Sequence, residues 1–440
     1  MTLDVSAPRS AGDPKPTGTA RATVWRPVQY LGSKLRALDA ITAVAADLND
    51  GGVFWDAFAG SSVVAQAAAQ AGFTVWATDT QQSSSAFSSA VLGVRATAQA
   101  ADSLPAFVDR LVGATHPETD IWSPWLARED ELIAAGDYDS LVDLYASLPQ
   151  RWRVDGEWNE LTPLTTTFAG TYLSLRQAMM LDAARYELQR LEVSQAVDPW
   201  SYDAALTALC HAASEAVHSA GKHFAQPMQP ATTGAANYEF VRGRSLRDRS
   251  VSVGARAIDA ANQLALLAPI GGSHDATTAD VLAVSADDLI ARGVGVVYAD
   301  PPYTAQQYSR FYHVLETLVK GVAEPIQIVR GETPKGLYPA NRYLSPFCSR
   351  RQAPAAFEHL VRIARDAGAH LILSYSTTGS DSGNQRTVSE ADLLTLVSSS
   401  YGPDCVSIVN LEYGYRQFNH ESRRTETIGT GEVLLIGVAS

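Results

Sequence analysis

Residues 53–79 read VFWDAFAGSSVVAQAAAQAGFTVWATD, and their pattern decides the fold. A short apolar run over 53–56 is followed by a Gly/Ser turn and by an alanine-rich stretch that predicts a helix over 62–71. A second apolar run over 73–77 leads to Asp79. A strand, a helix and a second strand at this spacing form a βαβ unit, whose crossover connection favours parallel strands. The sequence therefore predicts an α/β fold built on a mostly parallel sheet.

The remaining strands are predicted late in the chain, and the middle is predicted to be helical. Apolar runs predict strands over 294–299, 369–375, 405–411 and 433–438, and periodic patterns predict helices over 33–47, 308–322 and 354–367. Residues 100–275 hold few strand-like runs before the arginine-rich stretch near Tyr238, and their apolar residues recur near the helical period of 3.6. We therefore expect a disordered tail (1–24), one α/β domain (25–100 and 276–440), and a large, mainly helical insertion that splits this domain (101–275).

The composition excludes several classes of protein. The 440-residue chain is 46% hydrophobic and 18% charged, which is typical of a folded soluble protein. It has no run near the ~18 apolar residues that span a bilayer, and its first residues lack the apolar region of a signal peptide. Its three cysteines are too few and too widely spaced for a disulfide framework or a CxxC zinc site. We expect a cytoplasmic protein with no metal and no membrane partner.

The charges are segregated along the chain. The net charge is −13, from 34 basic and 47 acidic residues, and residues 101–161 alone carry thirteen acidic side chains against four arginines. Residues 238–256 instead carry five arginines against two acidic residues. Phosphate binding is local and screened beyond ~8–10 Å, so this distribution permits a nucleic-acid partner. The candidate contacts are Arg242, Arg244, Arg247, Arg249, Lys222 and His223. The alternative for the arginines is a solvated charged face, and the alternative for Lys222 and His223 is a structural role.

The sharpest motif is Asp300-Pro301-Pro302-Tyr303, directly after the apolar run over 294–299. Ligands of open parallel sheets bind outside the carboxyl ends of the strands, so we expect this motif to face a cleft. The prolines lack N–H groups, which leaves the Pro301 carbonyl as an acceptor beside the Asp300 carboxylate, and Tyr303 offers an aromatic face. Two acceptors beside a stacking surface suit a planar ring that bears an exocyclic amine. A turn that only ends the strand is the alternative.

A second element is the turn DAFAGSS over 56–62, after the first strand. Its glycine, Gly60, lets the backbone approach a ligand closely. Asp79 follows at the end of the next strand, where an acidic side chain can accept hydrogen bonds from ribose hydroxyls. The turn lacks both GxGxxG and GxxxxGK, so a ligand with a ribose and without phosphates fits it better than a nucleotide. A surface aspartate at a strand end is the alternative for Asp79.

Taken in order, these pieces resemble the Dam-like, S-adenosylmethionine-dependent N6-adenine DNA methyltransferases of the α group. The resemblance touches most of the chain from about 28 to 438. It rests on YLGSK (30–34), DAFAGSS (56–62), ATDTQQSSSAF (77–87), GTYLSLRQAMMLDAARYEL (170–188), GKHFAQP (221–227), VSADDL (284–289) and ADPPYTAQQYSRFYHVLETL (299–318). It implies a Rossmann-like class I methyltransferase domain, with the insertion as the DNA target-recognition region and double-stranded DNA as the partner.

The resemblance also implies roles for single residues. The residues that would hold S-adenosylmethionine are Tyr30, Lys34, Asp56, Phe58, Gly60, Asp79 at its ribose, and Asp287 near its adenine. The residues that would hold the target base are Asp300, Pro301, Pro302 and Tyr303. Two positions depart from the family. Ser62 stands where the family usually has glycine, and residues 82–85 lack the tyrosine that often follows the second-strand acid, so the cofactor contacts there stay open.

The implied reaction is methylation of the exocyclic N6 amine of a flipped-out adenine, in restriction-modification, phage defence or epigenetic marking. Asp300 and the Pro301 carbonyl would accept the two amine hydrogens and direct the nitrogen lone pair at the sulfonium methyl. A carbon-5 cytosine methyltransferase would need a nucleophilic cysteine, commonly after proline, and Pro346-Phe347-Cys348 is not that motif. The alternatives are methylation of RNA or of cytosine N4, and a non-catalytic DNA-binding module. A cognate restriction or defence protein would be a further partner.

Overall fold

The structure is a computed structural model that describes residues 24–30, 32–48, 51–151, 161–267, 273–376, 386–411 and 432–439. The predicted tail, apart from Val24, lies outside the described residues, and so does Leu31 of the YLGSK element.

Seven strands within the described residues form one sheet, in the order β3-β2-β1-β4-β5-β7-β6. Their bounds are β1 Val53–Asp56, β2 Val75–Asp79, β3 Asp275–Thr278, β4 Val294–Ala299, β5 His370–Ser376, β6 Val406–Leu411 and β7 Glu432–Gly437. The first five are paired in parallel, and β7 is antiparallel to both β5 and β6. The predicted α/β fold with a mostly parallel sheet is confirmed.

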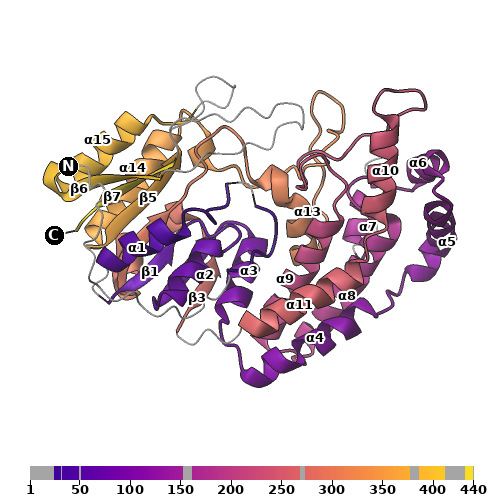
Figure 1. Ribbon diagram of the computed structural model, residues 1–440, viewed down its shortest axis with the longest axis horizontal. Coiled ribbons are helices and arrows are strands. Elements are labelled where there is room, and N and C mark those ends of the chain that lie inside the picture. Colours follow the sequence, from indigo (N-terminus) through magenta and orange to yellow (C-terminus); the bar gives the residue numbers. More distant parts are fainter. Residues whose placement is uncertain are drawn as a thin grey trace, which may run out of the picture.

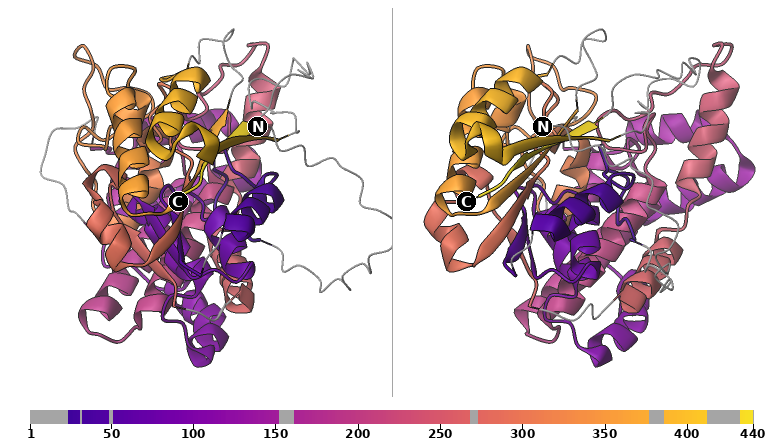
Figure 2. Two further views of the ribbon diagram at one scale, coloured as in Figure 1. Left: turned by 90° about the vertical axis from the view of Figure 1, so that its left-hand side faces the viewer. Right: turned by 60° about the vertical axis from the view of Figure 1, so that its left-hand side comes forward.

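Helices cover both faces of this sheet (Figures 1 and 2). Phe54 and Trp55 are neighbours in β1, so their side chains point to opposite faces, yet both are fully buried. A strand buried on both faces must be apolar throughout, which explains the continuous apolar runs in the sequence. The core on the Phe54 face includes α1 (Leu38–Leu48), α2 (Val63–Gln70) and α3 (Gln82–Leu92). The core on the Trp55 face includes α12 (Ala286–Ala291), α14 (Ala353–Asp366) and α15 (Glu390–Tyr401).

Between β2 and β3 the described chain is helical. After α3, its helices are α4 Ala98–Val112, α5 Thr119–Ala135, α6 Tyr138–Ser147, α7 Pro163–Phe168, α8 Leu175–Val193, α9 Pro199–Ala216, α10 Tyr238–Arg249 and α11 Val253–Leu267. The arginine-rich stretch near Tyr238 is thus a helix. Trp200 of α9 donates from its indole N–H to the Ala90 carbonyl of α3 at 3.1 Å. The helical region and the Phe54 face share one hydrophobic core, which includes Phe87 and Trp200.

The connection after β4 completes the fold. It contains α13 (Ser309–Lys320), which packs on α3, α7, α8 and α9, and then an irregular segment that leads to α14. The described part of the chain also contains three short 3₁₀ helices: η1 Val281–Ala283, η2 Pro346–Cys348 and η3 Pro403–Cys405. No helix in the described ranges is both long and apolar enough to span a bilayer.

Candidate active site

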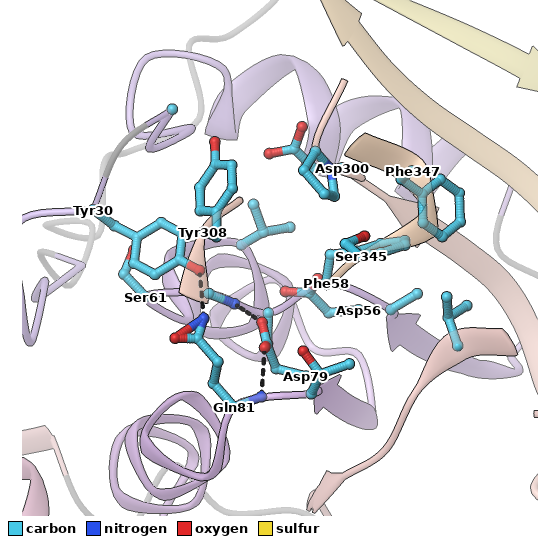
Figure 3. A pocket seen from close by; sticks show the side chains of 18 of the residues that line it. Tyr30, Asp56, Phe58, Ser61, Asp79, Gln81, Asp300, Tyr308, Ser345 and Phe347 are labelled. Carbon is cyan, nitrogen blue, oxygen red and sulfur yellow. Dashed lines mark hydrogen bonds between the residues drawn. The ribbon is translucent and has the colours of Figure 1, made fainter. Parts of the chain in front are cut away.

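One cavity lies at the carboxyl ends of β1, β2, β3 and β4, and Figure 3 shows the side chains around it. It holds about 940 Å³ of space, including open solvent at its mouth. Its walls come from six separate parts of the chain: 30 with 32–34, 56–64, 79–81, 279–281, 298–309 and 343–347. Segments that are far apart in the sequence therefore meet at the edge of the sheet where parallel α/β folds bind ligands.

The turn after β1 brings the backbone close to the cavity. Gly60 has φ +51°, and a Cβ there would lie 2.9 Å from the ring of Tyr30. Ser62, the first departure from the family pattern, has the left-handed φ of +62° that glycine adopts most easily. Its hydroxyl pairs with that of Ser88 at 2.7 Å. The turn therefore keeps a glycine-like backbone at Ser62 and supports it with a buried hydrogen bond.

Asp79 closes this turn from the end of β2. Its carboxylate accepts one hydrogen bond from the Gly60 N–H at 3.0 Å and another from the Gln81 N–H at 2.9 Å (Figure 3). Burial raises the pKa of Asp79 to about 6, although both amides act to lower it. Each carboxylate oxygen keeps a second lone pair, so Asp79 can still accept hydrogen bonds from a ligand.

Asp56 is the least satisfied group in the cavity wall. Its side chain is 1% exposed, and neither carboxylate oxygen has a well-formed hydrogen bond to any described residue. Burial raises the pKa of Asp56 to about 8, with the charge of Asp300 as the second cause, and the amides of Phe58 and Ala65 offset this only in part. A buried acid without a partner is suited to a cationic ligand, because a positive charge would stabilise the carboxylate.

Lys34 joins two carboxylates in another part of the cavity wall. Its Nζ lies 2.6 Å from Asp300 Oδ2 and 2.6 Å from Glu432 Oε1, and it also donates to the Gly32 carbonyl. Burial alone would lower the pKa of Lys34, but the two carboxylates raise it well above its ordinary value. Burial also raises the pKa of Asp300, and the Lys34 ammonium opposes that rise. Ser374 of β5 donates to Glu432 at 2.9 Å, so three strands hold this cluster in place.

The Asp-Pro-Pro-Tyr motif lies only partly in the cavity wall. Asp300 and Pro302 line the cavity, whereas Pro301 is buried behind them. Tyr303 is 9% exposed and lies outside the lining, with the Arg386 guanidinium 4.5 Å from its ring centre and Tyr375 against its edge. The structure thus brings the Asp300 carboxylate to the cavity and places the Tyr303 ring beside it.

Aromatic rings form the wall between Tyr30 and α13. The Tyr30 ring stacks on Tyr312 with centres 4.4 Å apart and on Tyr308 with centres 5.6 Å apart. Tyr30 and Tyr308 both line the cavity, while Phe311 belongs to the core. Gly32 has φ +75°, and a Cβ there would lie 3.2 Å from the Tyr308 hydroxyl, so this wall is closely packed.

Asp287 is not at the cavity. It is exposed on α12, and the acid that lines the cavity in this part of the chain is Asp280. Asp280 accepts a hydrogen bond from the Tyr343 hydroxyl at 2.9 Å, and Tyr343 also lines the cavity. Sequence reasoning missed Asp280, Tyr343 and Glu432. Asp280 lies two residues beyond the end of β3, but the sequence pattern does not predict that strand and so gave no signal for this acid.

The six candidate DNA contacts differ in their burial and in their partners. Arg249 is 7% exposed, donates to the carbonyls of Leu173 and Gly170 at 3.0 Å each, and has its guanidinium 4.2 Å from the centre of the Tyr145 ring. The expectation that it contacts DNA is wrong, because its guanidinium serves as a buried cross-link. Arg244 and Lys222 both pair with Asp248, and Arg244 also binds the Ser219 carbonyl.

The other three candidates are Arg247, Arg242 and His223. Arg247 is exposed on α10. Arg242 is part-exposed and donates to the Gly136 carbonyl at 3.2 Å, and the His223 ring packs edge-on against Phe311. Within the described ranges, no group of three or more His, Cys, Asp and Glu side chains is arranged to hold a metal ion.

Comparisons with known proteins relate this chain to DNA methyltransferases. The D12 class N6 adenine-specific DNA methyltransferase family matches residues 30–111. Over 142 residues the chain is 28% identical to the type II methyltransferase M.FokI of Planomicrobium okeanokoites, which covers 32% of this chain and 20% of that protein. Over 307 residues it is 22% identical to the modification methylase LlaI of Lactococcus lactis subsp. lactis, which covers 68% of this chain and 43% of that protein.

The chain thus spans less than half the length of each of these relatives. The family match contains the Tyr30 segment, the turn after β1 and Asp79, which form one side of the cavity. The resemblance to the N6-adenine DNA methyltransferases is confirmed.

Proposed function

We propose that this chain is a site-specific DNA methyltransferase that transfers a methyl group from S-adenosylmethionine to the N6 amine of adenine. One observation carries the proposal: a single cavity joins the Gly60 turn, Asp79 and the Asp300 carboxylate. The first two belong to the segment that matches the adenine methyltransferase family. The third offers an acceptor for an exocyclic amine.

The cavity wall fits the proposed cofactor. S-adenosylmethionine carries a sulfonium and an ammonium against one carboxylate, so it is a cation, and Asp56 is a buried carboxyl without a partner. Tyr30, Phe58 and Gly60 would pack against it, and Asp79 would accept from its ribose hydroxyls. Asp280 replaces Asp287 as the acid proposed for the adenine end. Lys34 acts mainly through Asp300 in this proposal, because its ammonium is already bound by two carboxylates.

The proposed chemistry needs orientation and not a protein nucleophile. When bound, S-adenosylmethionine supplies a methyl group that is already activated on sulfur. Asp300 Oδ2 is held by Lys34, so Oδ1 would accept one hydrogen of the target amine and direct its lone pair. The Pro301 carbonyl is proposed for the second hydrogen, although Pro301 itself is not among the residues that line the cavity. Cys348 is a poor candidate for a nucleophile, because burial raises its pKa to about 12 and its thiol is directed at the Gln306 carbonyl.

The wider assignments are part of the same proposal. Residues 25–100 and 276–440 would form the catalytic domain, and residues 101–275 would form the recognition region for double-stranded DNA. Tyr303 would pack against the flipped base, and its ring lies next to the cavity wall. Restriction-modification or phage defence is the proposed setting, since one relative is named a type II methyltransferase and the other a modification methylase. A cytoplasmic location and a cognate restriction or defence protein complete the proposal.

The test is to identify the methylated nucleoside. The full chain is incubated with unmethylated duplex DNA and S-adenosylmethionine labelled in its methyl group, and the DNA is then digested and its nucleosides are separated. We expect the label in N6-methyldeoxyadenosine. Label in N4-methylcytosine would favour cytosine-N4 methylation instead, and transfer only to an RNA substrate would favour RNA methylation. Binding of DNA with no binding of the cofactor by calorimetry would favour a non-catalytic module.

A further inference from the structure

A β-hairpin follows α13 in the segment that returns to the cavity wall. Ile326 pairs with Pro339, and Val329 pairs with Glu332 through two backbone hydrogen bonds of 2.9 and 3.1 Å. The two residues between them, Arg330 and Gly331, have φ values of +53° and +83°. A two-residue loop with positive φ at both positions is the tight type I′ turn that fits twisted strands. Residues 326–339 are here called the 326–339 hairpin.

The base of this hairpin is firmly attached. Tyr338 is buried, and its hydroxyl donates to the Ala225 carbonyl. Arg310 of α13 has its guanidinium 4.7 Å from the centre of the Tyr338 ring, and Arg342 donates to the Gln327 side chain at 2.6 Å. The base is therefore fixed to α13 and to the segment before α10.

The hairpin is also continuous with the cavity wall. Four residues beyond its end, Tyr343 lines the cavity, and Ser345 follows. The Ser309 hydroxyl at the start of α13 donates to the Tyr343 carbonyl at 2.7 Å, so both ends of the segment meet at the cavity. The loop that forms the tip rises above α13 in Figure 1. A segment with a tight turn at its tip is thus attached beside the cavity and projects from the protein.

The tip carries an apolar pair with basic neighbours. Ile328 is 60% exposed and Val329 is 44% exposed. Arg330 and Lys335 are exposed too, and neither forms an ion pair with a carboxylate in the described ranges, while Glu332 is the acid of the turn. Two adjacent exposed β-branched side chains at a tight, projecting turn indicate a contact surface. Their basic neighbours favour a polyanion as the partner.

We propose that the tip of the 326–339 hairpin enters a groove of duplex DNA beside the adenine that is turned into the cavity. The proposal rests on the proposed function. A base that reaches Asp300 must leave a duplex lying across the mouth of the cavity, where the hairpin is attached. The major groove admits a two-stranded ribbon. Extrusion leaves a gap in the base stack that apolar side chains can fill, so Ile328 and Val329 contact bases, and Arg330 and Lys335 contact phosphates.

The test uses a double variant, Ile328→Thr with Val329→Thr, because threonine keeps the β-branched shape that suits a strand. The matched control is Leu266→Ala, which removes an exposed apolar side chain of α11 that is 81% exposed. Affinity for a linear, unmethylated plasmid fragment is measured by gel shift, and affinity for S-adenosylhomocysteine by calorimetry. We expect the double variant to bind the fragment about tenfold more weakly, while its S-adenosylhomocysteine affinity and melting temperature match wild type.

An unchanged DNA affinity in the double variant would overturn the hairpin proposal. An equal loss of DNA affinity in the double variant and in Leu266→Ala would overturn it as well, because the loss would then not be specific to the tip of the hairpin. Methyl transfer to the same plasmid is measured in parallel. If wild type transfers no methyl group, the proposed function fails, and the gel shift still decides whether the hairpin binds DNA.

Discussion

At the scale of single residues, Asp56 makes the clearest connection between burial and ligand binding. The pKa of Asp56 is about 8 in the folded chain against an ordinary value of 3.8, so the folded chain keeps a proton that the unfolded chain loses above pH 4. The free energy of unfolding therefore falls as the pH rises from 4 to 8, by about 1.4 kcal/mol per unit for this group. The buried acid lowers stability at the pH where a cationic ligand would make use of it.

The Asp56→Asn variant tests this statement. The substitution removes the titrating group, so its stabilising effect on the free energy of unfolding should be larger by about 2 to 3 kcal/mol at pH 8 than at pH 6. Urea unfolding at the two pH values measures the difference, and the variant should also bind S-adenosylmethionine more weakly. A stability difference from wild type that is the same at both pH values would contradict the account.

Ser62 is a second residue whose effect can be separated into two parts. Its left-handed backbone costs about 1 kcal/mol for a residue other than glycine, and its hydrogen bond to Ser88 contributes about 1 kcal/mol. Ser62→Ala keeps the strained backbone and loses the bond, so it should destabilise by about 1 to 2 kcal/mol. Ser62→Gly loses both and should be close to neutral. Urea unfolding of the pair checks the order, and equal destabilisation would show that the backbone carries no strain.

At the scale of elements, α10 shows how one helix can be read wrongly from its composition. Four arginines within eight positions suggested a phosphate-binding surface. In the fold Arg249 faces inward to the carbonyls of Leu173 and Gly170, Arg244 pairs with Asp248, and Arg247 stays exposed. The sequence shows the residue types, but which of them face the protein depends on the partners of the helix.

The different burial of Arg249 and Arg247 can be tested by comparing the stability of their alanine variants. Arg249→Ala leaves two buried carbonyls without their charged donor and should lower the free energy of unfolding by about 2 to 4 kcal/mol. Arg247→Ala should change it by less than about 0.5 kcal/mol, because this side chain is exposed. Thermal and urea unfolding of both variants measure the effect. Similar stability of the two variants would mean that the buried cross-link contributes nothing.

Strands and helices were predicted best where burial made them apolar. β1 and β4 have the expected bounds, because residues buried on both faces give continuous apolar runs. β3 was missed, since Asp275-Ala276-Thr277-Thr278 is a partly exposed edge strand without such a run. α1 begins at Leu38 and not at Ser33, because a turn in which the Ala37 N–H donates to the Lys34 carbonyl precedes it. The turn leaves Lys34 outside the helix, where its side chain reaches Asp300.

At the scale of the whole molecule, the meeting of distant motifs was predictable and their supporting residues were not. The rule that ligands bind at the carboxyl ends of parallel strands placed Gly60, Asp79 and Asp300 together. Glu432 lies on an antiparallel strand at the far end of the chain, and nothing in its local sequence indicates that it shares Lys34 with Asp300. Tyr343 reaches the cavity only because the 326–339 hairpin returns the chain there.

The central claim is that the Asp300 carboxylate directs the amine of a target adenine, and methyl transfer by Asp300→Asn tests it most directly. The variant is compared with Asp287→Asn, which removes an exposed carboxylate from the same half of the chain. The single-turnover rate of label transfer to adenine is measured, with S-adenosylhomocysteine affinity and melting temperature recorded on the same samples. We expect Asp300→Asn to lose at least about a hundredfold in rate while it still folds and binds S-adenosylhomocysteine, and Asp287→Asn to match wild type. Adenine methylation by Asp300→Asn at the wild-type rate would contradict the account.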